Sequence, residues 1–439
     1  MPDLARAVIH RLAGVGGWWL ADRVVTLFAA FISQLVLVRV LGSVGYGELS
    51  YLLALTSLLL PIAQMGLSGL VVQAILSSES DEQQVLQSAL WLRAIGAAAA
   101  CAFGLLYWSF AESRPSERIV FVVLCLSQLA TIFSVIEFRF QARMRPHELV
   151  PMRMLVVLGS TVLRLWVAFS VGSVTAVVLI YALENLLIAM CHLLAYRRTT
   201  GRWLWPKRDL FWNGWFLQRA PWLLASGLAS VVYLKIDIVM MERLRGPAET
   251  GLYAAAARLS EVWYALPAVA IAAIFPVLLE GRADPQRWQQ NLQRVLDGLF
   301  AAALIIALTM QIIAVPLVTL ILGDAFAAAG PILAIHIWAG VFVFMREVFS
   351  RWLIAEDLLR YSLATHGIGA LMNVSLNLLL IPRFGGAGAA LGTVISYASA
   401  GWLSLFMFAR TRPMALLMTR ALLLPIRPRD LAGYLREIR

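Results

Sequence analysis

Basic side chains lie inside the long apolar runs of this sequence. Arg258 is the most deeply embedded, about seven residues, or roughly 10 Å, from the nearer end of its run at ~1.5 Å per helical residue. Arginine can hold two phosphate oxygens at once, whereas lysine acts as a point charge. We predict an internal site for an anionic group, formed first by Arg258, then Arg164 and Lys235, then Arg23 and Arg346.

Carboxylates accompany these cations. A carboxylate in apolar surroundings either neutralises a cation or takes up a proton or Na⁺. Glu261 follows Arg258 by three residues, so the two share a helix face and can pair. Such a pair could act as a switch if a bound anion displaced Glu261. Asp237 lies two residues from Lys235 and points elsewhere on its helix. The candidates for ion coupling are Glu261, Asp237, Asp22 and Glu184.

Several of these positions also have a purely structural explanation. Arg23 follows Asp22 and could extend to the membrane surface, and Arg346 adjoins Glu347. Arg93 and Arg153 are embedded too, but within about two turns of that surface, so they could extend out in the same way.

The composition identifies the elements that must position these groups. Of 439 residues, 61% are hydrophobic and 14% are charged, whereas soluble chains have about 45–50% and about 25%. This excludes a cytosolic enzyme, a disordered chain and a disulfide-stapled module. The net charge of +11 is explained by cytoplasmic loops and internal cations, so we expect no nucleic acid. The three cysteines lie in apolar runs without metal-like spacing, so we expect no metal site.

The apolar runs predict an all-α integral membrane protein with about twelve spans. A helix that crosses a ~30 Å hydrocarbon core needs about 20 residues. The predicted spans are 15–40, 49–76, 85–109, 119–138, 149–171, 174–196, 215–241, 251–279, 293–316, 328–350, 360–381 and 387–409.

Loop charge predicts the orientation. Arginine and lysine concentrate in the loops on the side of both termini, which the positive-inside rule places in the cytoplasm. The segment 197–222 combines cations with tryptophans, as is typical of a membrane interface. We therefore expect a six-helix bundle over 1–200, an interfacial linker over 201–214, a second bundle over 215–413 and an amphipathic cytoplasmic tail over 414–439.

The two halves also share an internal repeat. A shift of 204 residues superposes Gly42 on Gly246 and Gly47 on Gly251. A shift of 213 superposes 140–142 on 353–355. Because six spans separate the copies, both enter the membrane in the same direction. This predicts two pseudo-symmetric bundles related by an axis along the membrane normal.

Three segments resemble one family. Residues 37–47 look like its first periplasmic turn, and residues 323–329 look like the turn before its tenth span. The most specific segment, 373–390, reads NVSLNLLLIPRFGGAGAA and is similar to the signature that joins spans eleven and twelve. The family is the polysaccharide-biosynthesis (Wzx-type) flippases, within the superfamily that includes multidrug and toxin extruders (MATE) and lipid II flippases.

This resemblance implies a V-shaped, MATE-like pair of bundles around a cationic cavity in the bacterial inner membrane. It implies transfer of undecaprenyl-diphosphate-linked oligosaccharide to the periplasmic leaflet by a secondary transporter, not an enzyme. We expect no cofactor, with H⁺ or Na⁺ as the candidate coupling ion. Partners would be membrane lipids and the pathway's polymerase and glycosyltransferases; O-antigen and exopolysaccharide pathways both remain open. Ser33 and Gln34 stand where lipid II flippases have paired arginines. The alternative is a cation-coupled multidrug exporter of the same fold.

Overall fold

The computed structural model describes residues 2–77, 81–110 and 115–427. Within these ranges every regular element is a helix, which confirms the predicted all-α class. The chain divides into two compact units, Met1–Leu228 and Ala229–Arg439, and each is described by itself.

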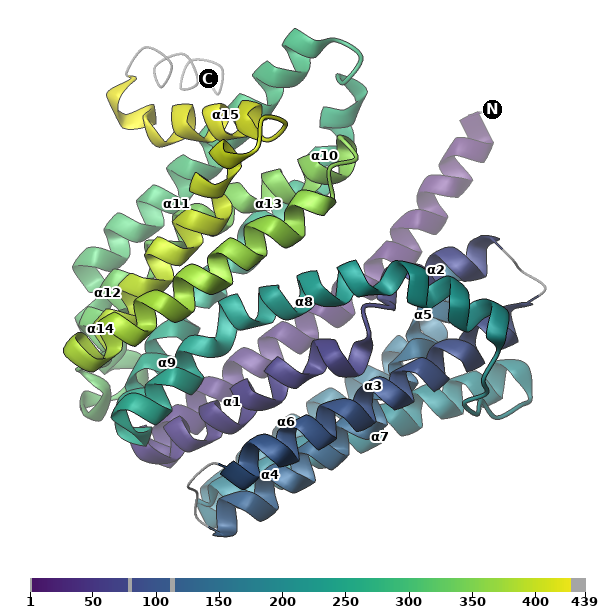
Figure 1. Ribbon diagram of the computed structural model, residues 1–439, viewed down its shortest axis with the longest axis horizontal. Coiled ribbons are helices and arrows are strands. Elements are labelled where there is room, and N and C mark those ends of the chain that lie inside the picture. Colours follow the sequence, from purple (N-terminus) through teal and green to yellow (C-terminus); the bar gives the residue numbers. More distant parts are fainter. Residues whose placement is uncertain (1, 78–80, 111–114, 428–439) are drawn as a thin grey trace. The chain divides into compact units, whose positions relative to one another are not determined.

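The first unit is a bundle of long helices (Figure 1). Its α-helices are α1 (Pro2–Gln64), α2 (Ser68–Ser77), α3 (Glu82–Phe110), α4 (Pro115–Gln128), α5 (Val135–Ala142), α6 (Val150–Val171) and α7 (Val174–Thr200). The 3₁₀ segments η2 (Leu129–Ser134) and η3 (Pro146–Glu148) interrupt it, and α8 (Leu210–Arg245) begins in this unit and continues into the second. Helix α1 packs against α3 and α6, and α6 packs against α7.

The second unit continues from α8. Its further α-helices are α9 (Pro247–Glu261), α10 (Ala265–Glu280), α11 (Pro285–Leu322), α12 (Ala329–His336), α13 (Ala339–Ala355), α14 (Arg360–Gly401) and α15 (Arg412–Leu422). Its 3₁₀ segments are η4 (Val262–Tyr264), η5 (Asp324–Phe326), η6 (Leu403–Met407) and η7 (Leu424–Ile426). A large apolar core cluster of this unit draws side chains from α10, α11, α13 and α15.

The helices account for the twelve predicted spans. In the described residues, nine helices are long and apolar enough to cross a membrane. Two of them contain a non-helical glycine, Gly42 in α1 and Gly385 in α14, so each of these two helices supplies two spans. Figure 1 shows the chain reversing direction inside both. The remaining span is α9–α10, which η4 divides into shorter pieces. The protein is therefore a multi-pass membrane protein.

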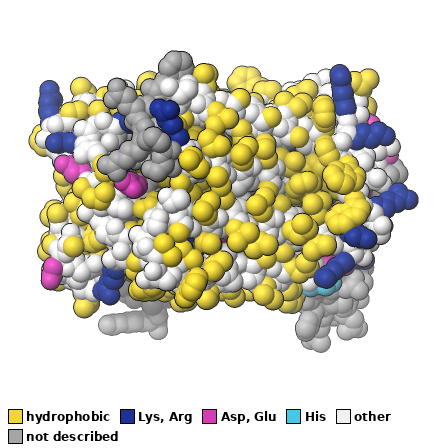
Figure 2. Space-filling model, turned by 90° about the horizontal axis from the view of Figure 1, so that it is seen from below, with side chains coloured by type: hydrophobic (Ala, Val, Ile, Leu, Met, Phe, Trp, Pro, Cys, Tyr) yellow, Lys and Arg dark blue, Asp and Glu magenta, His cyan; other side chains and the backbone are white. Residues whose placement is uncertain are grey.

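Helix α6 shows how the spans separate an outer face from an inner one. Its large exposed side chains recur at helical spacing: Leu155, Leu158, Val162, Trp166 and Phe169. Its buried side chains lie on the opposite face and include Val157, Ser160, Arg164 and Ala168. Figure 2 shows mainly hydrophobic side chains on the face in view, with Lys and Arg toward its edges. A lipid-facing exterior thus encloses a more polar interior within the bundle.

The backbone repeats at the glycines that the sequence aligns. Gly42 has φ 67° and ψ −179°, and Gly246 has φ 84° and ψ 177°. This region is essentially restricted to glycine. The same turn therefore joins the first two spans of each half.

A second repeated turn lies at the shift of 213. Met144 and Asp357, which this shift superposes, have φ 54° and φ 55°, and they are two of three non-glycine residues with positive φ in the described chain. The residue after each donates its N–H to a matching carbonyl, Arg145 to Phe140 at 2.9 Å and Leu358 to Leu353 at 2.8 Å. The two halves therefore share this turn at corresponding positions, as the internal repeat predicts.

The C-terminal helix packs on its own unit. Buried Met414, Leu417, Met418 and Ala421 form one face of α15, and α15 contacts α11. The Gln293 side chain also donates to the Leu417 carbonyl at 3.2 Å. The start of the predicted tail 414–439 therefore packs against the bundle. Residues 428–439 lie outside the described residues.

Candidate functional site

Two embedded cations meet one carboxylate in the second unit. The Lys235 ammonium on α8 donates to Glu261 on α9 at 3.0 Å (Oε1) and 3.3 Å (Oε2). Arg258 Nη1 lies 3.4 Å from Glu261 Oε2. Two positive charges therefore share one negative charge, and this group of three side chains, the Glu261 cluster, has a formal charge of +1.

The Glu261 cluster is accessible from outside the unit. The Arg258 side chain is 46% exposed, and those of Lys235 and Glu261 are each 23% exposed. An anion could contact Arg258 without first breaking up the bundle. The predicted pairing of Arg258 with Glu261 is confirmed. The sequence did not reveal the Lys235 contact, because it joins two helices.

Asp237 faces away from this cluster, as its spacing predicts. It is buried and accepts from the Ile238 backbone N–H at 2.8 Å, from the Tyr253 hydroxyl, and from the Thr393 hydroxyl at 3.4 Å. Across the described part of the chain, no Lys, Arg or His forms an ion pair with it. Asp237 is therefore a buried carboxyl group held by uncharged donors.

Two asparagines of the 373–390 motif hydrogen-bond one another on helix α14. Asn377 Nδ2 donates to Asn373 Oδ1 at 2.7 Å. Among the described atoms, Asn377 Oδ1 has no hydrogen-bond donor. A Cβ added at Gly392, the residue before Thr393, would lie 2.8 Å from that oxygen. The motif thus brings a buried amide oxygen close to Gly392, further along the same helix α14.

Among the residues that the structure describes, the hydrogen-bond partners of Arg346 are neutral and none is a carboxylate. Its guanidinium donates to the Ala400 carbonyl at 2.8 Å and to the Thr365 hydroxyl at 3.4 Å. It also lies 5.8 Å from the centre of the Phe349 ring. These contacts join α13 to α14, so Arg346 positions helices in this structure.

In the first unit, Arg164 is enclosed by the bundle. It forms an ion pair with Glu184 of α7 and donates to Ser33 of α1 at 3.2 Å. Its guanidinium lies 3.7 Å from the centre of the Tyr181 ring, and Arg164 is only 3% exposed. The Tyr181 hydroxyl accepts from Gln34 at 3.1 Å. Arg164 is therefore inside the protein, as predicted, but it is already neutralised.

Asp22 pairs with a different arginine from its sequence neighbour. Its carboxylate binds Arg153, which also donates to Glu137 at 2.8 Å. Arg23 is exposed.

Arg93 does not extend to the surface, because it is 1% exposed and donates to Ser134 at 2.6 Å.

Comparison with solved structures places the fold among membrane transporters. The lipid II flippase MurJ, in an inward closed conformation, matches with a TM-score of 0.69 and 13% identity, over 94% of this chain and 91% of that one. An inward-facing multidrug resistance MATE family transporter of the MOP superfamily matches with a TM-score of 0.67 and 12% identity, over 90% and 96%. A MOP superfamily transporter from Pyrococcus furiosus matches with a TM-score of 0.56 and 12% identity, over 95% and 96%. These similarities show that the chain has the fold of this structural class.

The sequence defines the family within that class. The profile of the family described as "Polysaccharide biosynthesis protein" matches residues 36–331, which is more than half of the chain. The protein belongs to this family, which confirms the resemblance seen in the motifs. No curated protein matches the chain by sequence.

Proposed function

We propose that this protein flips a lipid-linked oligosaccharide, most simply an undecaprenyl-diphosphate-linked repeat unit, from the cytoplasmic to the periplasmic leaflet. The family match supports a role in polysaccharide biosynthesis. The fold match to a lipid II flippase supports a lipid-linked cargo, and the match to MATE transporters supports alternating access. We further propose an inner-membrane location with both termini in the cytoplasm, beside the polymerase and glycosyltransferases of the pathway.

The observation that carries this proposal is the excess positive charge of the Glu261 cluster. Even a single charge at the centre of a bilayer costs several kcal/mol, so a diphosphate needs compensating cations on its path. Arg258 is exposed, lies on a predicted span and shares its carboxylate with Lys235. A diphosphate that bound Arg258 would leave Glu261 with Lys235, so no carboxylate would lose all its partners.

We propose roles for the other predicted cations that differ from the cargo-binding role of Arg258 and Lys235. Arg164 already has a carboxylate and a tyrosine ring as partners, so it would bind cargo only after the bundle had rearranged. Arg346 positions α13 against α14, and Arg23 is exposed without a defined role. We therefore rank Arg258 and Lys235 above Arg164 as cargo ligands.

We propose Asp237 as the coupling site for H⁺ or Na⁺. A buried carboxyl group without a cationic partner is stabilised either by protonation or by a bound cation. Tyr253 and Thr393 supply further oxygens around it. Glu261 is less suited to this role, because two cations already occupy its oxygens. The protein would then be a secondary transporter.

A reconstituted assay tests the proposal. Proteoliposomes containing a labelled undecaprenyl-diphosphate oligosaccharide should show protein-dependent exposure of the label in the opposite leaflet. Arg258→Gln should slow this exposure by about tenfold or more, equivalent to ~1.4 kcal/mol. Arg282→Gln, which removes a loop cation, should leave the rate unchanged. Transport of a cationic dye in place of the labelled lipid would instead identify a multidrug exporter.

A further inference from the structure

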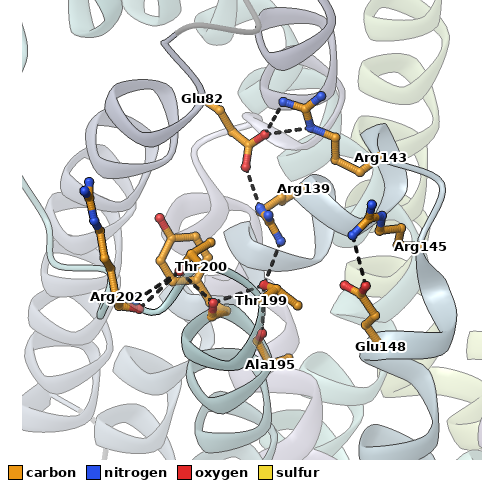
Figure 3. A network of polar contacts seen from close by, with 10 residues as sticks. Glu82, Arg139, Arg143, Arg145, Glu148, Ala195, Thr199, Thr200 and Arg202 are labelled. Atoms are coloured by element: carbon orange, nitrogen blue, oxygen red, sulfur yellow. Dashed lines mark hydrogen bonds and ion pairs between the residues drawn. The ribbon is translucent and has the colours of Figure 1, made fainter.

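The first unit carries two groups of basic side chains that differ in their partners. Residues 139–145 contain three arginines, and each pairs with a carboxylate. Arg139 and Arg143 both bind Glu82, and Arg145 binds Glu148 at 3.3 Å. Figure 3 shows Glu82 between its two arginines and Arg145 facing Glu148, whereas the Arg202 guanidinium points away from both carboxylates. This first group is largely neutralised within the protein.

The second group lies in the last turn of α7 and in the linker that follows, and it is not neutralised. Residues 197–208 contain five cations and no acidic residue. Among the described residues, none of these five forms an ion pair with a carboxylate. Arg202 donates to the neutral Gln83 at 3.2 Å, and Arg197 lies 4.5 Å from the centre of the Trp203 ring. All five cations are exposed.

The linker is nevertheless held in place. Leu204 and Trp212 are 1% and 4% exposed and belong to an apolar core cluster of the first unit. The Lys207 backbone N–H donates to the Gln87 carbonyl at 3.3 Å. Asp209 caps α8 by accepting from the Trp212 N–H at 2.9 Å. The five cations are therefore presented on a defined segment.

An exposed tryptophan accompanies these cations. Trp205 is 66% exposed, and tryptophan is enriched where a protein crosses the membrane–water interface. We propose that the linker surface, defined as Arg197, Arg198, Arg202, Trp205, Lys207 and Arg208, binds the phosphate groups of anionic phospholipids. The surface lies at the end of α7 and in the linker between α7 and α8. At this position we take bulk lipid of the adjoining leaflet, and not the transported cargo, as its ligand. This proposal does not depend on the proposed function.

Native mass spectrometry of the purified full chain tests the inference. Binding of phosphatidylglycerol is compared with binding of phosphatidylcholine at equal concentration. The linker variant Arg202→Gln/Lys207→Gln/Arg208→Gln should lose about tenfold or more in phosphatidylglycerol affinity, since each cation near an anionic lipid surface contributes roughly 1 kcal/mol. Phosphatidylcholine binding should not change.

A second triple variant is the matched control. Arg143→Gln/Arg145→Gln/Arg282→Gln also removes three positive charges, but each of these arginines pairs with a carboxylate. Its phosphatidylglycerol affinity should change by less than about twofold. Equal losses in the two triple variants, or no loss in the linker variant, would overturn the proposal.

Two further measurements do not require a substitution. Phosphatidylglycerol binding to the unaltered protein should weaken steeply between low and high salt, because exposed charges are screened. If binding does not depend on salt, the proposal fails even if the linker variant does not fold. Geranyl diphosphate should not displace phosphatidylglycerol; displacement at equal concentration would assign the surface to the cargo and would also overturn the proposal.

Discussion

Lys235 and Arg258 lie on different helices and share the carboxylate of Glu261, with nearest N–O distances of 3.0 Å and 3.4 Å. Their arrangement makes Glu261 the residue on which the local charge balance depends. Removing it would leave two cations facing each other.

We predict that Glu261→Gln destabilises the protein by about 1–2 kcal/mol. This is below the ~3–5 kcal/mol for breaking a fully buried pair, because the cluster is partly exposed. Thermal unfolding in detergent measures the change. Glu261→Gln combined with Lys235→Met should recover most of the loss, since only one cation then remains. If the double variant is as unstable as the single one, the shared carboxylate is not the cause.

Asp237→Asn should uncouple transport from its driving ion. The amide cannot release a proton or neutralise Na⁺, so accumulation driven by an ion gradient should be lost while downhill movement continues. Flipping assays with and without an imposed H⁺ or Na⁺ gradient measure this. Asp297→Asn is the matched control, because Asp297 is also buried but already lies 3.7 Å from Arg427. Equal gradient dependence in the Asp237 variant and the unaltered protein would exclude Asp237.

Arg164→Met should destabilise the protein by about 3 kcal/mol, because it leaves Glu184 unpaired inside the bundle. Arg164→Met combined with Glu184→Met should return the free energy of unfolding to within about 1 kcal/mol of the original, as is common when both members of a buried pair become apolar. Unfolding by denaturant measures both variants. A loss below about 1 kcal/mol in the single variant would show that Glu184 reaches water.

Gly42→Ala and Gly246→Ala should each cost about 1–3 kcal/mol, because alanine is strained in this backbone region. The two losses should be similar, since the dihedral angles are similar. Gly159→Ala in α6 is the control; its added Cβ meets nothing within 4 Å, and a helical Gly→Ala change favours the helix by up to ~1 kcal/mol. Thermal unfolding compares all three, and a Gly42 variant as stable as the control would contradict the strain argument.

Local features of the fold were predictable from the sequence because they depend on neighbours along the chain. Apolar runs predicted the spans, and a spacing of three residues predicted the Arg258–Glu261 pair. Contacts between helices were not predictable in this way. Asp22 binds Arg153, 131 residues away, instead of the adjacent Arg23, and Lys235 binds Glu261 across α8 and α9. Neither partner can be chosen from spacing, because several carboxylates and cations lie at similar depths.

Because the turns at Gly42 and Gly246 match, the side chains of the two halves can be compared position by position. The shift of 204 that aligns them places Phe31 opposite Lys235, Ala54 opposite Arg258 and Ser57 opposite Glu261. The backbone takes the same turn in both halves, whereas this charged trio occurs in only one of them. The first half carries its embedded charges at other positions, such as the Arg164–Glu184 pair, so matched turns do not imply matched ion sites.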